Sequence, residues 1–297
     1  MHAPAAVNVD ERRVRIALRF DPEPDPAAAG DVGALYESLL GYAVRAEARG
    51  VDLVWISERP FVVGARVPAA LPLCAALAAR TRSLRIGAGP LVLPLYHPLR
   101  VAEDAATLDG ISDGRLELAL GLGGEGQAFA GFGVPTHGRG DRLEEGLALL
   151  RSAWSGEPIA FSGRHHAVSG VAVSPQPVQS AGPPLWVGAE ADTAVRRAAR
   201  LGAGLLARTA AAIEVFRAAR PATGSPPSRV ALELDAETAQ ARGTRSELAR
   251  LVEAGGDAER FDLVVRAEAA PGGRWLDPHV LDALVSLRDE LAARVHA

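Results

Sequence analysis

Apolar and polar residues alternate along this chain with two different periods. Short runs dense in Val, Ile and Leu, typical of buried strands, precede longer segments whose apolar residues recur every three or four positions, as in amphipathic helices. The first pair is a strand over 14–20 and a helix over 35–49, which Gly50 ends. Further strands are expected over 51–56, 84–93, 115–122, 185–189, 204–207, 230–234 and 261–266, and further helices over 68–80, 99–111, 142–154, 193–201, 210–219, 245–254 and 278–295.

Eight strand–helix units in succession predict an α/β fold. Strict alternation implies a parallel sheet with helices outside it, and eight units favour closure into a (β/α)8 TIM barrel. The segment 156–184, rich in Gly, Pro, Ser and Val, interrupts the rhythm, so we expect an insertion between the fourth helix and the fifth strand. Residues 1–297 are expected to form this one domain, with 1–12 as a flexible N-terminal tail.

Composition excludes several classes of protein. A chain of 297 residues that is 48% hydrophobic can bury enough surface to fold without a disulfide or a metal. Its one cysteine, Cys74, cannot form an intramolecular disulfide, which suits a reducing compartment. The net charge of −4 and the absence of a basic run do not indicate nucleic-acid binding. Since no uninterrupted apolar segment is long enough for a membrane span, we expect a soluble, cytoplasmic protein.

Candidate chemistry should lie at the C-terminal ends of the strands, where (β/α)8 barrels carry their active sites. Glu58 and Arg59 follow the second expected strand. Either Glu58 holds Arg59 toward a ligand, or the two form an ion pair that faces solvent. Gly89-Pro90 lies inside the third strand, where a proline removes a ladder donor and therefore predicts a bulge. The peptide bond between them can be cis or trans.

Three other motifs are more simply explained by structure than by chemistry. The segment 121–126 fits G-x-G-x-x-G, but the next expected helix starts well downstream, which favours a flexible loop over a dinucleotide site. His165 and His166 are neighbours on an extended chain and would point to opposite faces, so no metal site is expected. His97 precedes a helix, where a capping or interface role is favoured over catalysis.

One stretch, residues 84–135, makes the chain resemble a known family. It contains VLPLYHP, LDGISDGR and FGV, and it is supported by GVDLVWISE at 50–58 and PLWVGAEA at 184–191. Together these motifs resemble the luciferase-like monooxygenase superfamily, especially its bacterial luciferase branch, over roughly residues 14–220. The resemblance implies a (β/α)8 barrel that binds reduced FMN or, less in keeping with these motifs, the deazaflavin F420.

The resemblance also implies a cofactor site. It places Gly89 and Pro90 at a bulge beside the flavin ring. The remaining positions near the cofactor are Leu122, Gly123, Gly188, Ala189, Glu190 and Ala191. Leu122 and Ala191 stand where the family has an arginine and a serine that contact the flavin phosphate, and Ala194 stands where it has a nearby threonine. Since a charged hydrogen bond contributes roughly 1.5–3 kcal/mol, weaker phosphate binding is expected.

Arg59 takes the position of a catalytic histidine in the family, with Glu58 beside it, and both are candidate catalytic residues. Imidazole can donate or accept a proton near neutral pH. Arginine stays protonated, so it can supply only charge and hydrogen-bond donors.

Three functions are compatible with these positions. The first is a monooxygenase that uses reduced FMN and O2 on a small organic substrate, with a flavin reductase as the partner that supplies reduced FMN. The alternatives are a flavin-free or non-catalytic subunit that pairs with a catalytic partner, and an F420-dependent oxidoreductase. His97 and Glu103 resemble dimer contacts of the family, which implies a homodimer or a heterodimer with a luciferase-like partner.

Overall fold

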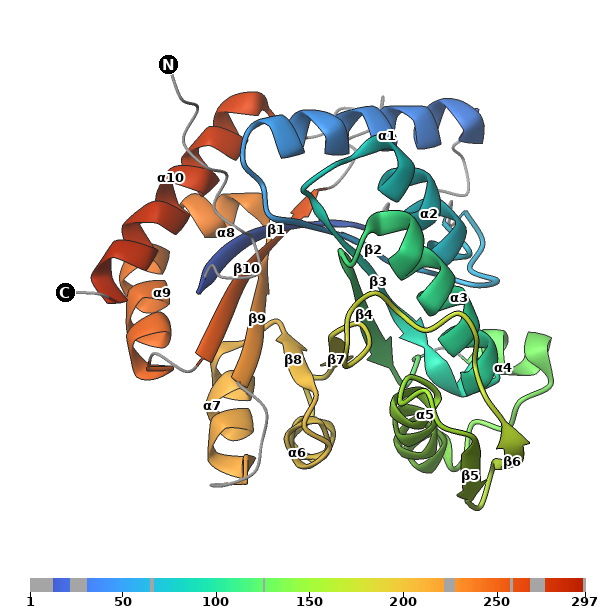
Figure 1. The fold of residues 1–297 in the computed structure, drawn as a ribbon. Helices are drawn as coiled ribbons and strands as arrows, with labels where there is room; N and C mark the ends of the chain where they lie inside the picture. The colour runs from blue at the N-terminus through green and yellow to red at the C-terminus, as the bar shows by residue number, and fades with distance from the viewer. Residues whose placement is uncertain are drawn as a thin grey trace.

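The structure, a computed structural model, describes residues 13–21, 31–64, 67–124, 126–221, 228–256, 259–267 and 276–295. Eight parallel strands close into a barrel with helices around it, which confirms the expected (β/α)8 fold (Figure 1). In order around the barrel the strands are β1 (Val14–Phe20), β2 (Leu53–Ile56), β3 (Arg85–Val92), β4 (Leu116–Gly121), β7 (Leu185–Gly188), β8 (Gly204–Ala207), β9 (Ser228–Leu234) and β10 (Glu259–Ala267). The expected tail over 1–12 lies outside the described residues.

The helices follow the strands in the expected order, with two short additions. The helices are α1 (Val32–Ala48), α2 (Ala70–Arg80), α3 (Pro98–Ser112), α4 (Gly126–Phe132), α5 (Arg139–Ala153), α6 (Asp192–Arg200), α7 (Ala210–Ala219), α8 (Ala236–Gln240), α9 (Arg242–Ala254) and α10 (Pro278–Val295). The expectation that no helix closely follows the glycines at 121–126 is wrong, because α4 begins at Gly126. Both α4 and α8 are too short for a helical period to stand out in the sequence.

The segment between α5 and β7 carries a small sheet of its own. Strands β5 (Ile159–Ser162) and β6 (Ala167–Val171) pair antiparallel and take no part in the barrel. His165 and His166 lie in the turn before β6, where their backbone N–H groups donate to the Glu145 carboxylate. Their backbone contacts therefore hold this turn against α5.

Polar residues at the helix ends explain where several helices begin. Asp31 accepts a hydrogen bond from Gly33 N–H at 2.8 Å and starts α1. His97 Nδ1 accepts from Leu99 N–H at 3.3 Å, and Pro98 is the first residue of α3. The structural interpretation of His97 as a helix cap is thus confirmed.

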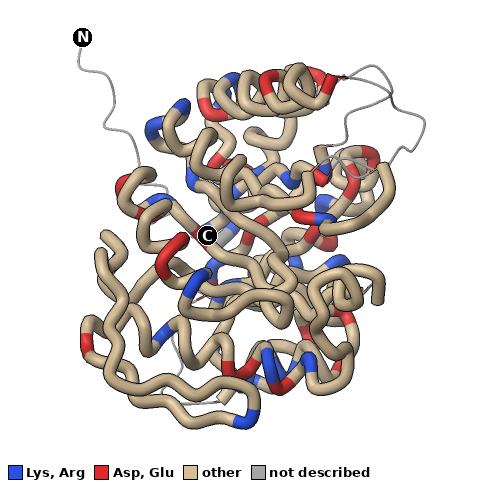
Figure 2. The backbone as a smooth tube through the Cα atoms, turned by 90° about the vertical axis from the view of Figure 1, so that its right-hand side faces the viewer, with Lys and Arg blue, Asp and Glu red and all other residues tan. Residues whose placement is uncertain are grey.

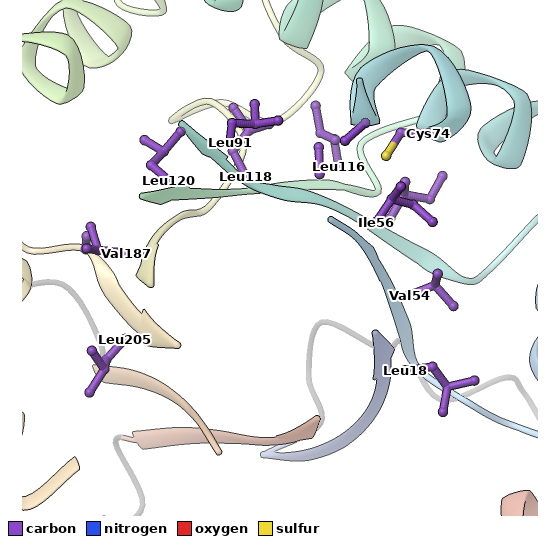
Figure 3. Close-up of a cluster of buried hydrophobic side chains, with 14 of the residues drawn as sticks. Leu18, Val54, Ile56, Cys74, Leu91, Leu116, Leu118, Leu120, Val187 and Leu205 are labelled. Atoms are coloured by element: carbon purple, nitrogen blue, oxygen red, sulfur yellow. The ribbon is translucent and has the colours of Figure 1, made fainter. Parts of the chain in front are cut away.

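The main core lies between the barrel wall and the helices. Its side chains come from the outward faces of the strands and from the helix faces that cover them (Figure 3). Leu18, Ile56 and Leu118 are fully buried there, together with Cys74 of α2. Fully burying one such aliphatic side chain contributes about 1.5–3 kcal/mol. Burial also raises the pKa of the Cys74 thiol above its ordinary value.

Inside the barrel, the inward-facing side chains form three layers. The middle layer is apolar and is dominated by Trp55 and Trp186, whose rings meet edge to face at 6.0 Å. Gly87 and Gly204 make room for them, because a Cβ on either glycine would lie within 3 Å of an indole atom. The layer below, at the N-terminal ends of the strands, contains the charged residues Arg15, Glu117 and Asp262. The layer above, at the C-terminal ends, contains Arg19 and Glu233. The tryptophans thus separate two polar regions.

Acidic and basic residues are interspersed on the outer helices (Figure 2). Arg80 pairs with Glu37 at 2.7 Å and Arg100 with Asp104 at 2.5 Å, both exposed. Such pairs contribute little to stability because water screens them. Among the described residues, no helix has the length and apolar character that crossing a membrane requires.

Candidate active site

Two adjoining cavities open at the C-terminal end of the barrel. One has a volume of about 260 Å³ and the other about 320 Å³. Both are lined by Arg19 of β1, Pro90 of β3, and Gly121 and Gly123 at the end of β4. The first cavity extends toward the residues after β2, and the second toward those after β7 and β8. This is the end of the barrel at which the sequence places the site.

The floor beneath both cavities is the bulge of β3. The register between β3 and β4 shifts between Ala88 and Leu91, which confirms the bulge, and the Gly89-Pro90 bond is cis. Gly89 has φ +122°, and a Cβ there would lie 2.2 Å from the carbonyl oxygen of Ala119. Only glycine therefore fits at this point of the strand.

The Pro90 ring lies between two further glycines. A Cβ on Gly121 would lie 3.3 Å from Pro90 Cβ, and one on Gly188 would lie 3.1 Å from Pro90 Cγ. Without side chains at these two positions, the proline ring and the neighbouring backbone form a low apolar surface. A flat ring can pack on such a surface.

Arginines and carboxylates form a connected network beside this floor. Arg19 Nε donates to Ser57 Oγ at 2.7 Å, and its guanidinium also pairs with Glu233 of β9 and, at 3.2 Å, with Asp21. Asp21 in turn accepts two hydrogen bonds from Arg59, at 2.6 and 2.9 Å. Each positive charge in this network therefore already faces a carboxylate.

Glu58 is a second buried carboxyl group of the mouth besides Glu233, only 7% exposed. It accepts hydrogen bonds from Val92 N–H at 2.9 Å and from Tyr96 Oη–H at 2.7 Å. Burial raises the pKa of Glu58, and these hydrogen bonds oppose part of that shift. The expected contact between Glu58 and Arg59 is wrong. Asp21 forms the bidentate ion pair with Arg59, and Glu58 instead accepts a hydrogen bond from the end of β3.

The second cavity contains the positions expected near a cofactor phosphate. Leu122, Gly123, Gly188, Ala189 and Glu190 all line it. Ala191 lies directly after them as the residue before α6, and its side chain makes no capping hydrogen bond. The polar side chains that line this cavity are those of Arg19, Glu190, Arg208 and Glu233.

Arg208, which lines this cavity, Arg139, which contacts its wall at Gly123, and the start of α6 are groups that could hold an anion besides Arg19. Glu190 accepts from Arg208 N–H at 2.5 Å and lies 3.5 Å from its guanidinium. Arg139 of α5 donates to the Gly123 carbonyl oxygen at 3.1 Å. The N–H groups of the first turn of α6 add a partial positive charge. A planar cofactor with a phosphate could therefore be held here, its ring by the Pro90 surface and its phosphate by Arg139, Arg208 and the start of α6.

Sequence reasoning placed most lining residues at the mouth but missed three of its polar residues. Arg19, Glu233 and Tyr96 were not singled out, although each contacts a residue of the network or the anchor of β3. Arg19 carried a usable signal, since it faces inward two positions after Ala17 on β1. The roles assigned to Arg59, Glu58 and the cofactor positions stay predictions.

Two histidines outside the mouth come close together. The rings of His97 and His166 lie 5.6 Å apart, edge to face. Burial, followed by the proximity of His97, lowers the pKa of His166. In the described part of the chain, no three His, Cys, Asp or Glu side chains are grouped to hold a metal ion.

Comparisons with known proteins place this geometry in context. A family model described as luciferase-like monooxygenase matches residues 14–268. The F420-dependent glucose-6-phosphate dehydrogenase of Beutenbergia cavernae is 34% identical over 185 residues, which is 60% of this chain and 54% of that protein. The oxygenase component of the flavin-dependent trigonelline monooxygenase of Acinetobacter baylyi is 29% identical over 157 residues, 52% of this chain and 43% of that protein. The chain spans about half the length of these relatives.

A solved structure supports the fold along nearly the whole chain. The monooxygenase RslO1 from Streptomyces bottropensis superposes with a TM-score of 0.70 at 23% identity. The match covers 95% of this chain and 98% of that one. At this identity the likeness concerns the fold alone.

Proposed function

The chain belongs to the luciferase-like monooxygenase family, and on that basis we propose that its barrel mouth binds reduced FMN and oxygenates a small organic substrate with O2. Reduced FMN, when bound, supplies the electrons and activates the oxygen. A separate flavin reductase would provide the reduced FMN. We place the reaction in the cytoplasm, a reducing compartment.

The observation that carries this proposal is the floor of the two cavities. The β3 bulge brings the Pro90 ring between Gly121 and Gly188, directly beneath both cavities. A ring system packed on this surface would have the apolar side chains of the first cavity, Val62, Val92 and Phe129, on its substrate side. These side chains favour an apolar or aromatic substrate.

Charged side chains would orient the reactants. Arg59 and Arg19 line the first cavity and present N–H donors to it while Asp21 balances their charge. Because arginine stays protonated, Arg59 orients an oxygen atom or stabilises negative charge on it but does not accept a proton. Burial raises the pKa of Glu58, so its carboxyl group is a candidate for holding or passing a proton at the mouth.

We expect this chain to bind the cofactor phosphate more weakly than family members that keep the polar phosphate contacts. Leu122, Ala191 and Ala194 offer no side-chain donor, so Arg139, Arg208 and the amides of α6 would bind the phosphate. Glu190 already accepts from the Arg208 backbone, and its negative charge lowers the attraction for an anion. Two or three lost charged contacts, at roughly 1.5–3 kcal/mol each, amount to orders of magnitude in affinity.

An F420-dependent oxidoreductase is the second candidate. The curated relative of 34% identity uses F420, and F420 shares the planar ring and the phosphate that this mouth fits. A flavin-free or non-catalytic subunit is the third, and the replacement of a histidine by Arg59, held in an ion pair, favours it.

We also propose that the chain works as a dimer, either of itself or with a luciferase-like partner. An apolar groove of about 350 Å³ lies between α2 and α3, lined in part by Leu71, Pro72 and Ile111. Ile111 is 51% exposed in the isolated chain. Sedimentation of the purified chain would test this, and a monomer at high concentration would exclude the homodimer.

Anaerobic titration tests the three functions against one another. The purified protein is titrated with oxidised FMN, photoreduced FMN and reduced F420 while heat and tryptophan fluorescence are recorded. Saturable binding of reduced FMN, followed by O2 consumption with a flavin reductase present, supports the monooxygenase. Binding of F420 alone supports the second candidate, and binding of none of them supports the third.

A further inference from the structure

A third cavity lies at the opposite end of the barrel from the mouth. It has a volume of about 460 Å³ and opens where β7, β8 and β9 begin. Its lining consists of Arg151 of α5, Arg229 of β9, and residues 179–185 and 202–204, which lead into β7 and β8. Two arginines thus line this cavity, and no Asp or Glu is among its described lining residues. The mouth differs, because its arginines are paired with carboxylates.

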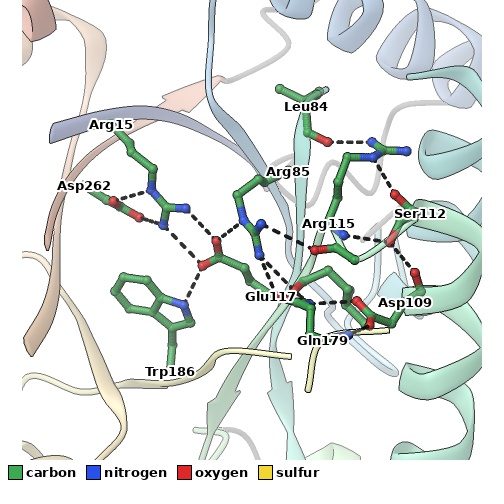
Figure 4. A network of polar contacts seen from close by, with 12 residues as sticks. Arg15, Leu84, Arg85, Asp109, Ser112, Arg115, Glu117, Gln179, Trp186 and Asp262 are labelled. Carbon is green, nitrogen blue, oxygen red and sulfur yellow. Dashed lines mark hydrogen bonds and ion pairs between the residues drawn. The ribbon is translucent and has the colours of Figure 1, made fainter. Parts of the chain in front are cut away.

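The charged layer inside the barrel continues up to this cavity. Arg15 pairs with both Asp262 and Glu117, and Arg85 pairs with Glu117 at 2.5 Å (Figure 4). Glu117 also accepts a hydrogen bond from Trp186 Nε1–H at 2.7 Å. The two carboxylates of this layer are therefore fully engaged by other partners.

Arg229 lies beside these carboxylates, but among the described residues it forms no ion pair with a carboxylate. It faces the barrel interior on β9, two positions before the inward-facing Ala231. Its Nη1 is buried and has no hydrogen-bond partner among the residues that the structure describes. A buried charged donor without a partner is unfavourable, because the group has lost its water and gained nothing in return. Burial accordingly lowers the pKa of Arg229, while Glu117 and Asp262 offset only part of the effect.

Arg151 approaches the same cavity from the outside. Its Nη2 donates to the Gly202 carbonyl oxygen at 3.2 Å, and no carboxylate pairs with it among the described residues. The cavity thus presents two guanidinium groups, that of Arg229 from inside the barrel and that of Arg151 from α5 outside it. Hydrogen bonds to Asp109 and Arg85 fix the neighbouring Gln179 side chain.

We propose that this basal cavity binds a small oxyanion, a phosphate or a carboxylate, between Arg229 and Arg151. The anion would accept hydrogen bonds from the part of the Arg229 guanidinium that lines the cavity and from the N–H groups of Arg151. Its negative charge would also stabilise the buried Nη1 of Arg229. The site is independent of the mouth, since the Trp55–Trp186 layer lies between the two. It would couple the stability of the barrel to the concentration of its ligand.

Titration with inorganic phosphate tests the proposal without any flavin. Binding is followed by calorimetry and by the rise in Tm, at constant ionic strength maintained with chloride. The unmodified chain should bind phosphate saturably, and Arg229→Gln and Arg151→Gln should each weaken binding by about 10-fold or more. Arg250→Gln, which removes an exposed arginine on α9, is the matched control and should bind as the unmodified chain does.

Two further experiments complete the test. In the first, malonate replaces phosphate: binding of both ions supports a general oxyanion site, and binding of phosphate alone supports a phosphate ligand.

The second experiment uses the variant Arg208→Gln. Because Arg208 lies at the mouth, this variant shows whether phosphate binds there instead. Phosphate binding that is lost in Arg208→Gln and kept in Arg229→Gln overturns the proposal, as does an absence of saturable binding. Arg151 is exposed, so its variant keeps the test valid if Arg229→Gln does not fold.

Discussion

Arg59 and Asp21 form a bidentate ion pair across the mouth of the barrel, with Nε–Oδ1 and Nη2–Oδ2 distances of 2.6 and 2.9 Å. Asp21 follows β1 and Arg59 follows β2, and the two strands are neighbours in the barrel. The same carboxylate also pairs with Arg19. Asp21 thus orders two guanidinium groups that line one cavity, and its negative charge limits the net positive charge offered to a ligand.

Replacing Arg59 tests whether this pair is functional. Arg59 is 36% exposed, so water screens the pair, and Arg59→Gln should change the free energy of unfolding by less than about 1 kcal/mol. If Arg59 orients the reactants, turnover should fall by about 10-fold or more, the value of one charged hydrogen bond. Denaturation and O2 consumption measure the two effects. Unchanged turnover in Arg59→Gln would remove Arg59 from the catalytic candidates.

A side chain at the β3 bulge should not be tolerated. In Gly89→Ala the new Cβ would meet the Ala119 carbonyl oxygen at 2.2 Å, in a backbone conformation that disfavours L-residues. We expect a loss of about 3 kcal/mol or more in the free energy of unfolding. Gly110→Ala is the matched control: its Cβ meets nothing within 4 Å, and alanine in a helix should be neutral or stabilising by up to about 1 kcal/mol. Equal effects of the two substitutions in chemical denaturation would contradict the bulge geometry.

The raised pKa of Glu58 predicts a specific dependence of stability on pH. The folded protein holds the Glu58 proton more tightly than the unfolded chain does, so this group's contribution to stability falls as the pH rises from the ordinary glutamate pKa toward the raised one. Glu58→Gln imitates the protonated carboxyl and removes this dependence. Unfolding free energies of both proteins, measured over that pH range, should therefore diverge as the pH increases, with the variant gaining on the unmodified chain. A constant difference between them would show that Glu58 does not titrate there.

The buried charge layer predicts a large effect at Arg15. Its guanidinium bonds to Asp262 and Glu117, and all three side chains are fully buried. Arg15→Leu leaves two carboxylates without this partner and should cost about 3–5 kcal/mol in the free energy of unfolding. Arg100→Leu, which breaks an exposed pair, should cost far less. A mild effect of Arg15→Leu in urea denaturation would mean that the remaining arginines compensate.

The barrel itself could be predicted from the sequence, because the two periods of its strands and helices are local properties. The position of Glu58, Arg59 and the Gly89-Pro90 bulge at one end followed, since parallel strands bring their C-terminal ends together. The short helices α4 and α8 were missed because so few residues show no period. The inward direction of Arg19 could also have been predicted, because residues two positions apart on a strand face the same side and Ala17 faces inward.

Partners could not be predicted, because they depend on distances in space between residues far apart in the chain. Arg19 pairs with Glu233 across 214 positions, and Arg15 with Asp262 across 247. Nothing in the local pattern told whether Arg59 would contact Glu58 or Asp21, or that no carboxylate in the described part of the chain would pair with Arg229. Residue order determined the barrel and the end at which its chemistry lies, whereas closure of the sheet decided which charges meet, since a charge is stabilised only by the groups that the fold brings within a few ångströms.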